Sequence, residues 1–277
     1  MPDQIAGGKL PKRFDYRTIA MPSLMRANRP VPPEYVDNQD KVKKPWNVLG
    51  NDTQKDCTCA AAGHAEMLWT AERGVQVNPT QDDILKAYSA ITGYKAGDPA
   101  TDNGADLLSV LKYWQSTGIA GQQIQAFAEI SPRDIDMLKW TISSLGFAYV
   151  GILLPSVWMV KFKGGTGPPF DTDRRFLDPA TWQNPINGHC VIYTGYCPDG
   201  LTCVTWGDEK KVSWAFHKAN CDEAYAIIPP EPADSAEASL NLEELQKSLD
   251  AVKAMRPVGT PPKASPRTSN SPAESAG

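Results

Sequence analysis

Apolar side chains recur at helical spacing through much of the chain between residues 57 and 145. The pattern predicts four helices, the first beginning at Cys57 and the second capped by Thr80 and Asp83. Gly118 and Gly146 follow the last periodic positions of the third and fourth helices, where glycine often ends a helix. The predicted helical stretches are residues 57–73, a second beginning at 80, 105–117 and 131–145.

The pattern of apolar positions changes after Gly146. Residues 147–154 form an apolar run of strand length, and residues 161–178 form a loop rich in glycine, proline and aspartate. Trp214 and Phe216 alternate with other residues and are expected to be core positions of a strand. Helices followed by strands are typical of an α+β fold. Further strands are predicted near residues 189–196, 201–206, 211–216 and 223–228.

The two ends of the chain differ from the middle, which spans residues 49–230. Residues 1–48 are rich in proline and charge, and we expect them to wrap the domain as an extended segment. Within residues 231–277, a 3-4-3 spacing of apolar residues predicts one amphipathic helix at about 240–255. That helix either docks on its own domain, as we expect, or provides a seam for a partner or a second copy. The residues after 255 have a composition typical of disorder.

Composition and charge narrow the classes of function. The chain has 277 residues and a net charge of −4, and no block of lysine or arginine stands out. We therefore expect neither nucleic acid nor an anionic membrane as a partner. No apolar run reaches the length of a membrane span, and the N-terminus lacks the pattern of a secretory signal. The default expectation is a cytoplasmic protein.

The six cysteines do not form the pattern of a disulfide framework or a zinc site. Cys57 and Cys59 are spaced C-x-C, and no second pair accompanies them. Cys190 and Cys203 lie in apolar runs and are expected to be buried free thiols. The sequence therefore predicts no metal site and implies no other cofactor.

Cys57 and His189 are the candidate chemical pair. Cys57 follows a polar loop and begins a helix, where partial positive charge favours thiolate over thiol. His189 lies in a β-branched and aromatic run that predicts a strand. A sulfur on a helix facing an imidazole on a sheet is the arrangement of nucleophilic thiol catalysis.

The other candidates are weaker. Cys59 lies two positions, about 200°, round the helix from Cys57 and is expected to be buried behind it. His64 lies about 10 Å along the same helix from Cys57, too far for a direct hydrogen bond, and is expected to be a packing residue. His217 is expected in a surface turn.

Several segments together resemble the papain-like cysteine peptidase superfamily, in the style of its divergent bacterial and phage-associated members. The separation of 132 positions from Cys57 to His189 falls in the range of that superfamily. The resemblance lies in the common order of short matches over residues 33 to about 228. The matches are the N-terminal segment at 33–37, the cleft turn with its helix at 102–118, and the helix-to-strand junction at 146–152. The histidine strand at 188–196 and the Asn-Ser-Trp-Gly-like segment at 204–207 follow.

The resemblance implies a two-lobe α+β fold, with a helical lobe packed against an antiparallel sheet or barrel. It also implies a hydrolase that cleaves peptide bonds in a protein or peptide substrate, with Cys57 as nucleophile and His189 as base. Gly104 would line the substrate cleft.

Further site residues also follow from the resemblance. Asn51 stands six residues before Cys57, where the family has its oxyanion glutamine, although Gly50-Asn51-Asp52 is equally a plain turn. Thr205 matches the imidazole-orienting asparagine by spacing, while Val204 matches it by motif. Trp206 would shield the imidazole from water.

Asn51 and Thr205 depart from the glutamine and asparagine of the family, and these departures leave alternatives open. Asparagine is shorter than glutamine by one methylene, and threonine is less directional than an amide. A catalytically degenerate papain-fold protein that acts as a binding module is therefore the second hypothesis. Another thiol acyl-transfer enzyme, such as an amidase, a transglutaminase or a cell-wall peptidase, is the third. The 56 residues before Cys57 do not resemble the family's long helical pro-segment, and whether they cover the cleft is left open.

Overall fold

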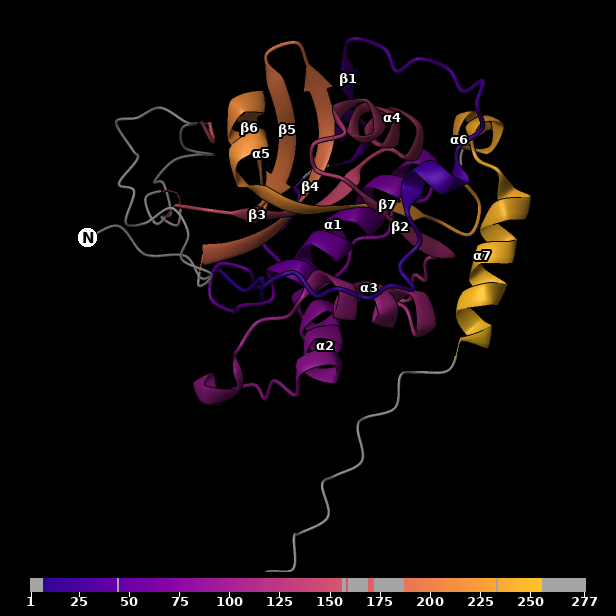
Figure 1. Ribbon diagram of the computed structural model, residues 1–277. Helices are drawn as coiled ribbons and strands as arrows, with labels where there is room; N and C mark the ends of the chain where they lie inside the picture. Colours follow the sequence, from indigo (N-terminus) through magenta and orange to yellow (C-terminus); the bar gives the residue numbers. More distant parts are fainter. Residues whose placement is uncertain are drawn as a thin grey trace, which may run out of the picture.

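The computed structural model describes residues 7–43, 45–155, 158, 169–171, 187–232 and 234–255. Three helices gather on one side of a seven-stranded sheet, as Figure 1 shows, and further helices cover its other face. The three are α1 (Cys57–Glu72), α2 (Gln81–Thr92) and α3 (Leu107–Ser116). All three lie where the sequence predicts them, α2 and α3 from their caps and apolar spacing and α1 from the good helix formers after Cys57.

Local sequence explains where these helices begin. Thr80 and Asp83 form a reciprocal capping box at the start of α2, and Gly93 ends that helix at φ 78°. The side chain of Asp106 accepts a hydrogen bond from the backbone of Ser109 and so caps α3. Asp56 precedes α1 without a capping hydrogen bond from its side chain, which distinguishes the start of the helix that carries Cys57.

The sheet is antiparallel, with strand order β2-β7-β3-β4-β5-β6. β1 pairs with β4 off this path. The strands are β1 (Val36–Asp37), β2 (Ala126–Ile130), β3 (Ala148–Leu153), β4 (Gly188–Cys197), β5 (Gly200–Thr205), β6 (Asp208–Ser213) and β7 (Cys221–Ile228). β2 was not predicted, since its five residues show no alternation and are buried at four positions.

Successive side chains of the strands point alternately into two hydrophobic cores, one on each face of the sheet. Tyr149 and Ile192 belong to the core shared with α1, α2 and α3. Their neighbours Val150 and Val191 point to the opposite face, because successive strand residues alternate. That face packs against α4 (Ile135–Leu145) and α5 (Trp214–Asn220). The predicted α+β class is therefore confirmed.

The segment before α1 contains little regular structure. It holds two short 3-10 turns, η1 (Met21–Leu24) and η2 (Gln39–Lys41), besides β1. A third such turn, η3 (Pro99–Thr101), precedes α3. Figure 1 shows the indigo N-terminal segment passing across several other elements.

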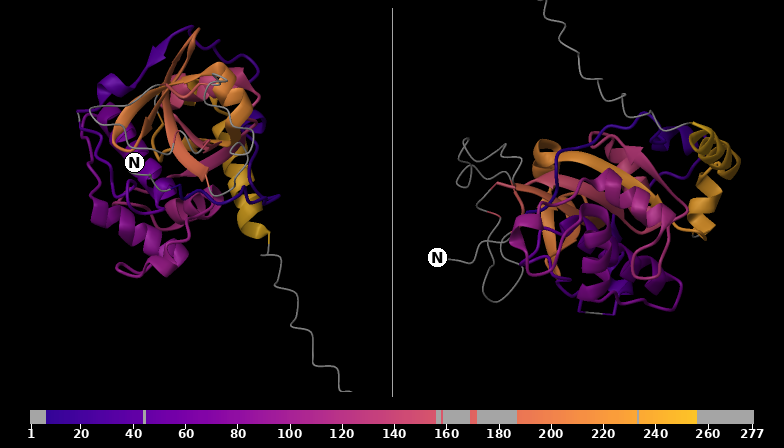
Figure 2. Two further views of the ribbon diagram at one scale, coloured as in Figure 1. Left: turned by 90° about the vertical axis from the view of Figure 1, so that its left-hand side faces the viewer. Right: turned by 90° about the horizontal axis from the view of Figure 1, so that it is seen from below.

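The C-terminal part forms α6 (Asp234–Ser239) and α7 (Leu242–Ala254). α7 lies along one side of the molecule in both views of Figure 2. Leu245 is buried, and the backbone N–H of Asn241 donates to the carbonyl of Leu24 at 2.8 Å. The amphipathic helix therefore docks on its own chain, and the residues after 255 lie outside the described residues.

Two expectations about residues 211–217 are wrong. Strand β6 ends at Ser213, whose hydroxyl accepts a hydrogen bond from the backbone of Phe216 and caps α5, so Trp214 and Phe216 lie on a helix. His217 is fully buried, and its Nε2 donates to the carbonyl of Pro132 at 2.8 Å, so it is not in a surface turn. Of the predicted loop 161–178, only residues 169–171 are described.

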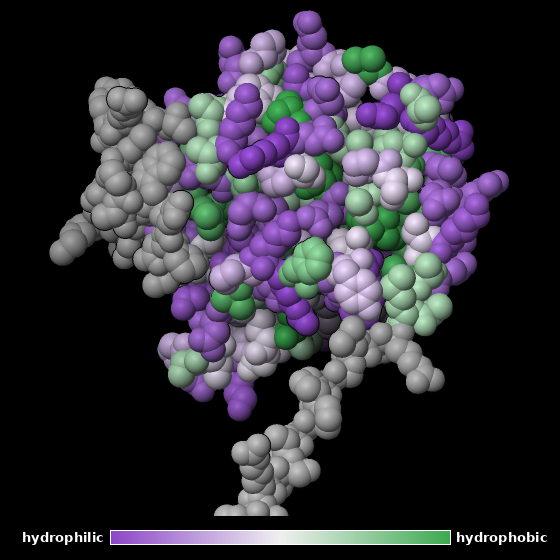
Figure 3. All heavy atoms as spheres, viewed as in Figure 1, coloured by the Kyte–Doolittle hydropathy of each residue, from purple (hydrophilic) through white to green (hydrophobic). Residues whose placement is uncertain are grey.

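The face of the molecule in Figure 3 is mainly hydrophilic, with hydrophobic residues in small separate patches. Within the described residues, no helix combines the length and the apolar character needed to cross a bilayer.

Candidate active site

Cys57 is the first residue of α1 and is completely buried. The hydroxyl of Tyr149 on β3 donates to the carbonyl of Thr58 at 2.7 Å and ties the start of α1 to the sheet. The thiol receives hydrogen bonds from the backbones of Cys190, on β4, and Gly8. Cys190 directly follows His189, so the fold brings the sulfur to the strand that carries the imidazole.

The ring of His189 is fixed from two directions. Its Nε2 lies 2.6 Å from the hydroxyl of Thr205, and the indole of Trp206 stacks on the ring with centroids 4.5 Å apart. Thr205 is thus the hydrogen-bond partner at the position that the spacing selected, and Val204 belongs to the core. Burial lowers the pKa of His189 to about 3, with a smaller contribution from His64, so the imidazole is neutral near pH 7.

The backbone explains how Trp206 reaches the imidazole. Thr205 and Asp208 are paired across the β5–β6 hairpin, which leaves Trp206 and Gly207 as a two-residue loop. Both loop residues have positive φ, 51° and 77°, as a type I′ turn requires. A left-handed conformation costs a non-glycine residue about 1–2 kcal/mol, so the turn carries strain where the indole covers the ring.

The second ring nitrogen of His189, Nδ1, differs from Nε2 in its hydrogen bonding. Nδ1 is buried and has no hydrogen-bond partner among the described residues, Cys57 included. Buried polar atoms are nearly always paired, so an unpaired imidazole nitrogen needs an explanation. When Nε2–H donates to Thr205, Nδ1 carries the lone pair that a base needs.

The thiol of Cys57 is neutral in this conformation. Burial raises its pKa to about 12, the charge of Asp56 raises it further, and the hydrogen bonds from Cys190 and Gly8 oppose the shift. The helix N-terminus alone predicts a lowered pKa, but here desolvation outweighs it. The expectation of a resting thiolate is therefore wrong for this conformation.

Asn51 is buried beside the start of α1. Its side-chain amide donates to Oδ1 of Asp56 at 3.2 Å, so one of its two N–H bonds is already engaged. Burial raises the pKa of Asp56 well above its ordinary value, while the Asn51 hydrogen bond lowers it. Asn51 is thus held by the carboxyl that immediately precedes Cys57.

Two residues set aside as catalytic candidates have packing roles. His64 is buried, and its Nε2 donates to the carbonyl of Asn47 at 2.9 Å, which joins α1 to the loop before Asn51. Burial lowers the pKa of His64 to about 4. Cys59 is also buried, and burial raises its pKa well above the ordinary value.

Residues 8–10 lie between the two lobes and bond to both. On the sheet side, the backbone N–H of Lys9 donates to the carbonyl of Gly188 at 3.0 Å. On the helical side, the N–H of Ala105 donates to the carbonyl of Gly8 at 2.9 Å, and the N–H of Leu10 donates to the carbonyl of Ala105 at 3.0 Å. Gly104, the predicted cleft residue, therefore adjoins a backbone that is already paired with another segment of the chain.

The side chain of Lys9 reaches two acidic residues, the buried Glu223 and the partly exposed Asp222. Its Nζ lies 2.7 Å from Oδ2 of Asp222 and 2.9 Å from Oε1 of Glu223, and the lysine side chain is 0% exposed. Burial alone would lower the pKa of Lys9, but Glu223 and Asp222 outweigh it and raise the pKa. Burial raises the pKa of Glu223, opposed by the charge of Lys9. Sequence reasoning missed all three residues, since none belongs to a motif.

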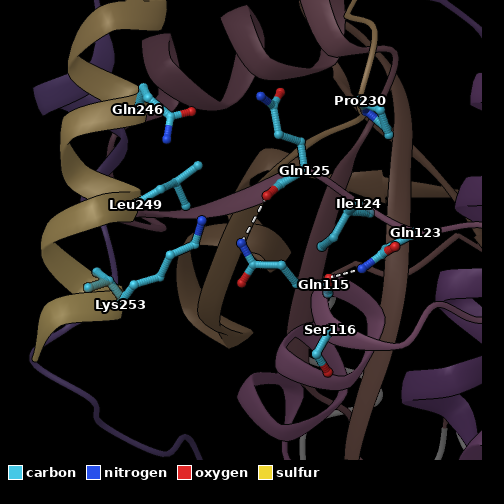
Figure 4. Close-up of a pocket in the computed structure, with 10 residues that line it drawn as sticks. Gln115, Ser116, Gln123, Ile124, Gln125, Pro230, Gln246, Leu249 and Lys253 are labelled. Atoms are coloured by element: carbon cyan, nitrogen blue, oxygen red, sulfur yellow. Dashed lines mark hydrogen bonds between the residues drawn. The ribbon is translucent and has the colours of Figure 1, made fainter. Parts of the chain in front are cut away.

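A groove beside α7 lies outside this site. It has a volume of about 580 Å³, and Figure 4 shows that amide side chains make up much of its lining. Gln115 donates to the carbonyl of Gln125 at 2.9 Å across its wall. The lining includes no cysteine or histidine, so the groove holds neither member of the candidate pair. In the parts of the chain that are described, no cluster of three or more metal-binding side chains occurs.

Comparison with known proteins finds similarity in structure and not in sequence. No family model matches the chain, and no curated protein matches it. Xylellain, a cysteine protease from Xylella fastidiosa, is similar with a TM-score of 0.60 and 15% identity, over 83% of this chain and 98% of that one. Digestive procathepsin L 3 of the Tenebrio molitor larval midgut has a TM-score of 0.56 and 14% identity, over 80% and 75%.

Identities this low establish the architecture alone. Xylellain is a cysteine protease by description, and the alignments cover most of both neighbours, 98% and 75% of their lengths. The chain therefore has the papain-like two-lobe α+β fold.

Proposed function

We propose that this chain is a thiol-dependent hydrolase of peptide bonds, with Cys57 as nucleophile and His189 as general base and acid. The observation that carries the proposal is the arrangement around His189. Thr205 holds Nε2, Trp206 covers the ring, and Nδ1 is unpaired. The next residue in the chain, Cys190, contacts the sulfur through its backbone. A purely structural histidine would be expected to have both nitrogens satisfied.

The proposed reaction starts from the neutral pair. Nδ1 of His189 takes the proton of the Cys57 thiol, and the thiolate attacks the carbonyl carbon of the substrate and forms a C–S bond. The imidazolium then gives its proton to the amine nitrogen as the C–N bond breaks. Water attacks the acyl-enzyme, the C–S bond breaks, and the sulfur regains a proton.

Two N–H groups are proposed to hold the oxyanion. The backbone N–H of Cys57 is in the first turn of α1, where N–H groups have no partner within the helix. The second donor is the N–H of Asn51 that Asp56 does not engage. Each such donor lowers the activation free energy by roughly 3 kcal/mol.

A degenerate binding module is the second candidate, and the state of the thiol favours it. A pKa of about 12 for Cys57 and about 3 for His189 describes a pair at rest. The two candidates differ in what happens when residues 8–10 leave the sulfur. A hydrolase then cleaves peptide amides, whereas a binding module has a thiol no more reactive than free cysteine.

The test is hydrolysis of a fluorogenic peptide library by the full chain, with Cys57→Ala as the matched variant. We expect turnover that Cys57→Ala abolishes and Cys59→Ala retains. Turnover that persists in Cys57→Ala would refute the assignment of the nucleophile.

A further inference from the structure

Lys9 is the least expected buried residue in the molecule. Lysine is almost never fully buried without a partner, and its segment is otherwise extended and exposed at many positions. Here the ammonium has two carboxylates within 3 Å, from Asp222 and Glu223. The hydroxyl of Tyr225 donates to the other oxygen of Glu223 at 3.1 Å and fixes that side chain. The acidic site is thus a built one, with its own support.

The backbone around Lys9 is held as a bound peptide would be. Three main-chain hydrogen bonds join residues 8–10 to Gly188 on one lobe and Ala105 on the other. Main-chain pairing of this kind binds an extended peptide regardless of sequence, and side-chain sites then supply selectivity. The segment pairs in parallel with Ala105.

Glycines line the path wherever residues 8 and 9 come closest. A Cβ on Gly104 would lie 2.1 Å from the carbonyl oxygen of Gly8, and one on Gly188 would lie 2.2 Å from that of Lys9. A Cβ on Gly151 would lie 2.3 Å from Cε of Lys9, so Gly151 opens the way to Asp222 and Glu223. Three separate elements therefore leave room for a peptide backbone and one long side chain.

The path also passes the candidate nucleophile. The backbone of Gly8 hydrogen-bonds to the thiol of Cys57, and Lys9 is the next residue. A side chain seated where Lys9 is seated therefore belongs to a residue next to the one that touches the sulfur.

We infer that Asp222 and Glu223 form a substrate subsite that selects a lysine or arginine side chain, and that Lys9 is its resident occupant. The inference rests on the proposed function and adds a substrate class to it. Two carboxylates face one ammonium, so the site favours a cation and disfavours an acidic or apolar side chain. The guanidinium of an arginine can bond both carboxylates at once.

The test uses a full-length variant in which residues 8–10 are displaced from the site; this is called the unseated variant. In Gly8→Ala/Lys9→Ala, the new Cβ of residue 8 would lie 2.0 Å from the carbonyl oxygen of Lys55, and the lysine side chain is lost. Lys12→Ala is the matched control, because it removes an ion pair of the same segment, with Glu129, away from the acidic site. The readout is the rate of Cys57 alkylation by iodoacetamide, mapped by mass spectrometry, with folding checked by circular dichroism.

We expect Cys57 alkylation in the unseated variant to be at least about tenfold faster than in the wild type, and Lys12→Ala to match the wild type. Acetyl-Gly-Lys-Leu-amide, which copies residues 8–10, should protect Cys57 of the unseated variant at a concentration about tenfold lower than the methionine analogue. Adding Glu223→Gln should reduce that preference several-fold. Equal protection by the lysine and methionine peptides, or a preference that survives Glu223→Gln, overturns the inference.

Two arrangements keep the result decisive. If the unseated variant does not fold, Lys9→Gln replaces it, since glutamine still offers hydrogen-bond donors to the acidic pair. Alkylation and protection need no turnover, so they separate the inference from the proposed function. Selective protection without hydrolysis of any lysine or arginine peptide supports the subsite and refutes the hydrolase.

Discussion

The two sides of the candidate site are in different states. On the sheet side, His189 has its Nε2 partner, its stacked indole and an unpaired Nδ1. On the helix side, the thiol of Cys57 is neutral and touched by the backbone of Gly8, and Asn51 is engaged by Asp56. The difference teaches that the β5–β6 hairpin fixes the orientation of the imidazole. The protonation state of the sulfur depends instead on the segments that bury it.

The largest expected effect comes from removing the sulfur. Cys57→Ala should lower hydrolysis by on the order of 10³-fold or more, because Cys57 is the proposed nucleophile that forms the acyl intermediate. Cys59→Ala should stay within a few-fold of the wild type, since Cys59 faces away. Steady-state kinetics on a fluorogenic lysine peptide measures both variants. A Cys57→Ala enzyme with more than a tenth of the original rate would contradict the assignment.

The pH dependence of alkylation sharpens the same comparison. With a pKa of about 12 for Cys57, the wild-type rate should rise about tenfold for each pH unit between 7 and 10, because only the thiolate reacts. A cysteine in a short blocked peptide, with a pKa of about 8.5, should instead level off above pH 9. Stopped-time alkylation and mass spectrometry give both curves. A wild-type plateau near pH 8 would show that the thiol is not held neutral.

A smaller effect tests the sheet side through Thr205. Thr205→Val removes the hydroxyl that lies 2.6 Å from Nε2 of His189, and kcat/KM should fall about 10-fold to 100-fold. Thr205→Ser should restore most of the loss, because it keeps the hydroxyl. The pH profile of kcat should move in Thr205→Val and return in Thr205→Ser. Equal losses in both variants would mean that Thr205 acts through packing alone.

The smallest effect concerns stability away from the sulfur. Burial raises the pKa of Glu66 well above its ordinary value, while the indole N–H of Trp114 donates to the carboxyl at 2.9 Å. The folded state therefore holds a proton that the unfolded state releases above about pH 4.5, and stability falls as pH rises beyond that value. Glu66→Gln keeps the acceptor and should raise the free energy of unfolding by about 1–3 kcal/mol at pH 8, but little at pH 4.5.

Glu209→Gln is the matched control for this substitution. Glu209 accepts a hydrogen bond from Trp46 at 2.9 Å in a partly exposed position. Urea unfolding at the two pH values should show a larger pH-dependent gain for Glu66→Gln than for Glu209→Gln, because Glu66 is buried and Glu209 is partly exposed. Identical behaviour of the two variants would refute burial as the cause.

The helices and the strand that carries His189 could be predicted because their signals are local. The capping residues of α2 and the good helix formers of α1 act within a few residues, and the strand of His189 is a β-branched run. The segment 214–220 was misjudged because Trp214 and Phe216 alternate like strand residues. The hydroxyl of Ser213 caps the backbone of this segment and stabilises it as a helix.

The occupant of the site could not be predicted, because its signal is tertiary. Lys9 and Asp222 are 213 positions apart, and neither belongs to a periodic or spaced pattern. The raised pKa of Cys57 could not be predicted either, since a helix N-terminus alone argues for the opposite shift. The burial that reverses it comes from the packing of three separate segments around the sulfur.

The central claim is that Cys57 and His189 act as a pair, and one measurement addresses it directly. The rate constant for Cys57 alkylation at pH 6 should be determined in Gly8→Ala/Lys9→Ala with and without His189→Ala. If the imidazole takes the thiol proton, losing it should slow alkylation at least about 30-fold, since a free thiol is almost fully protonated at that pH. Equal rate constants with and without the imidazole would contradict the account.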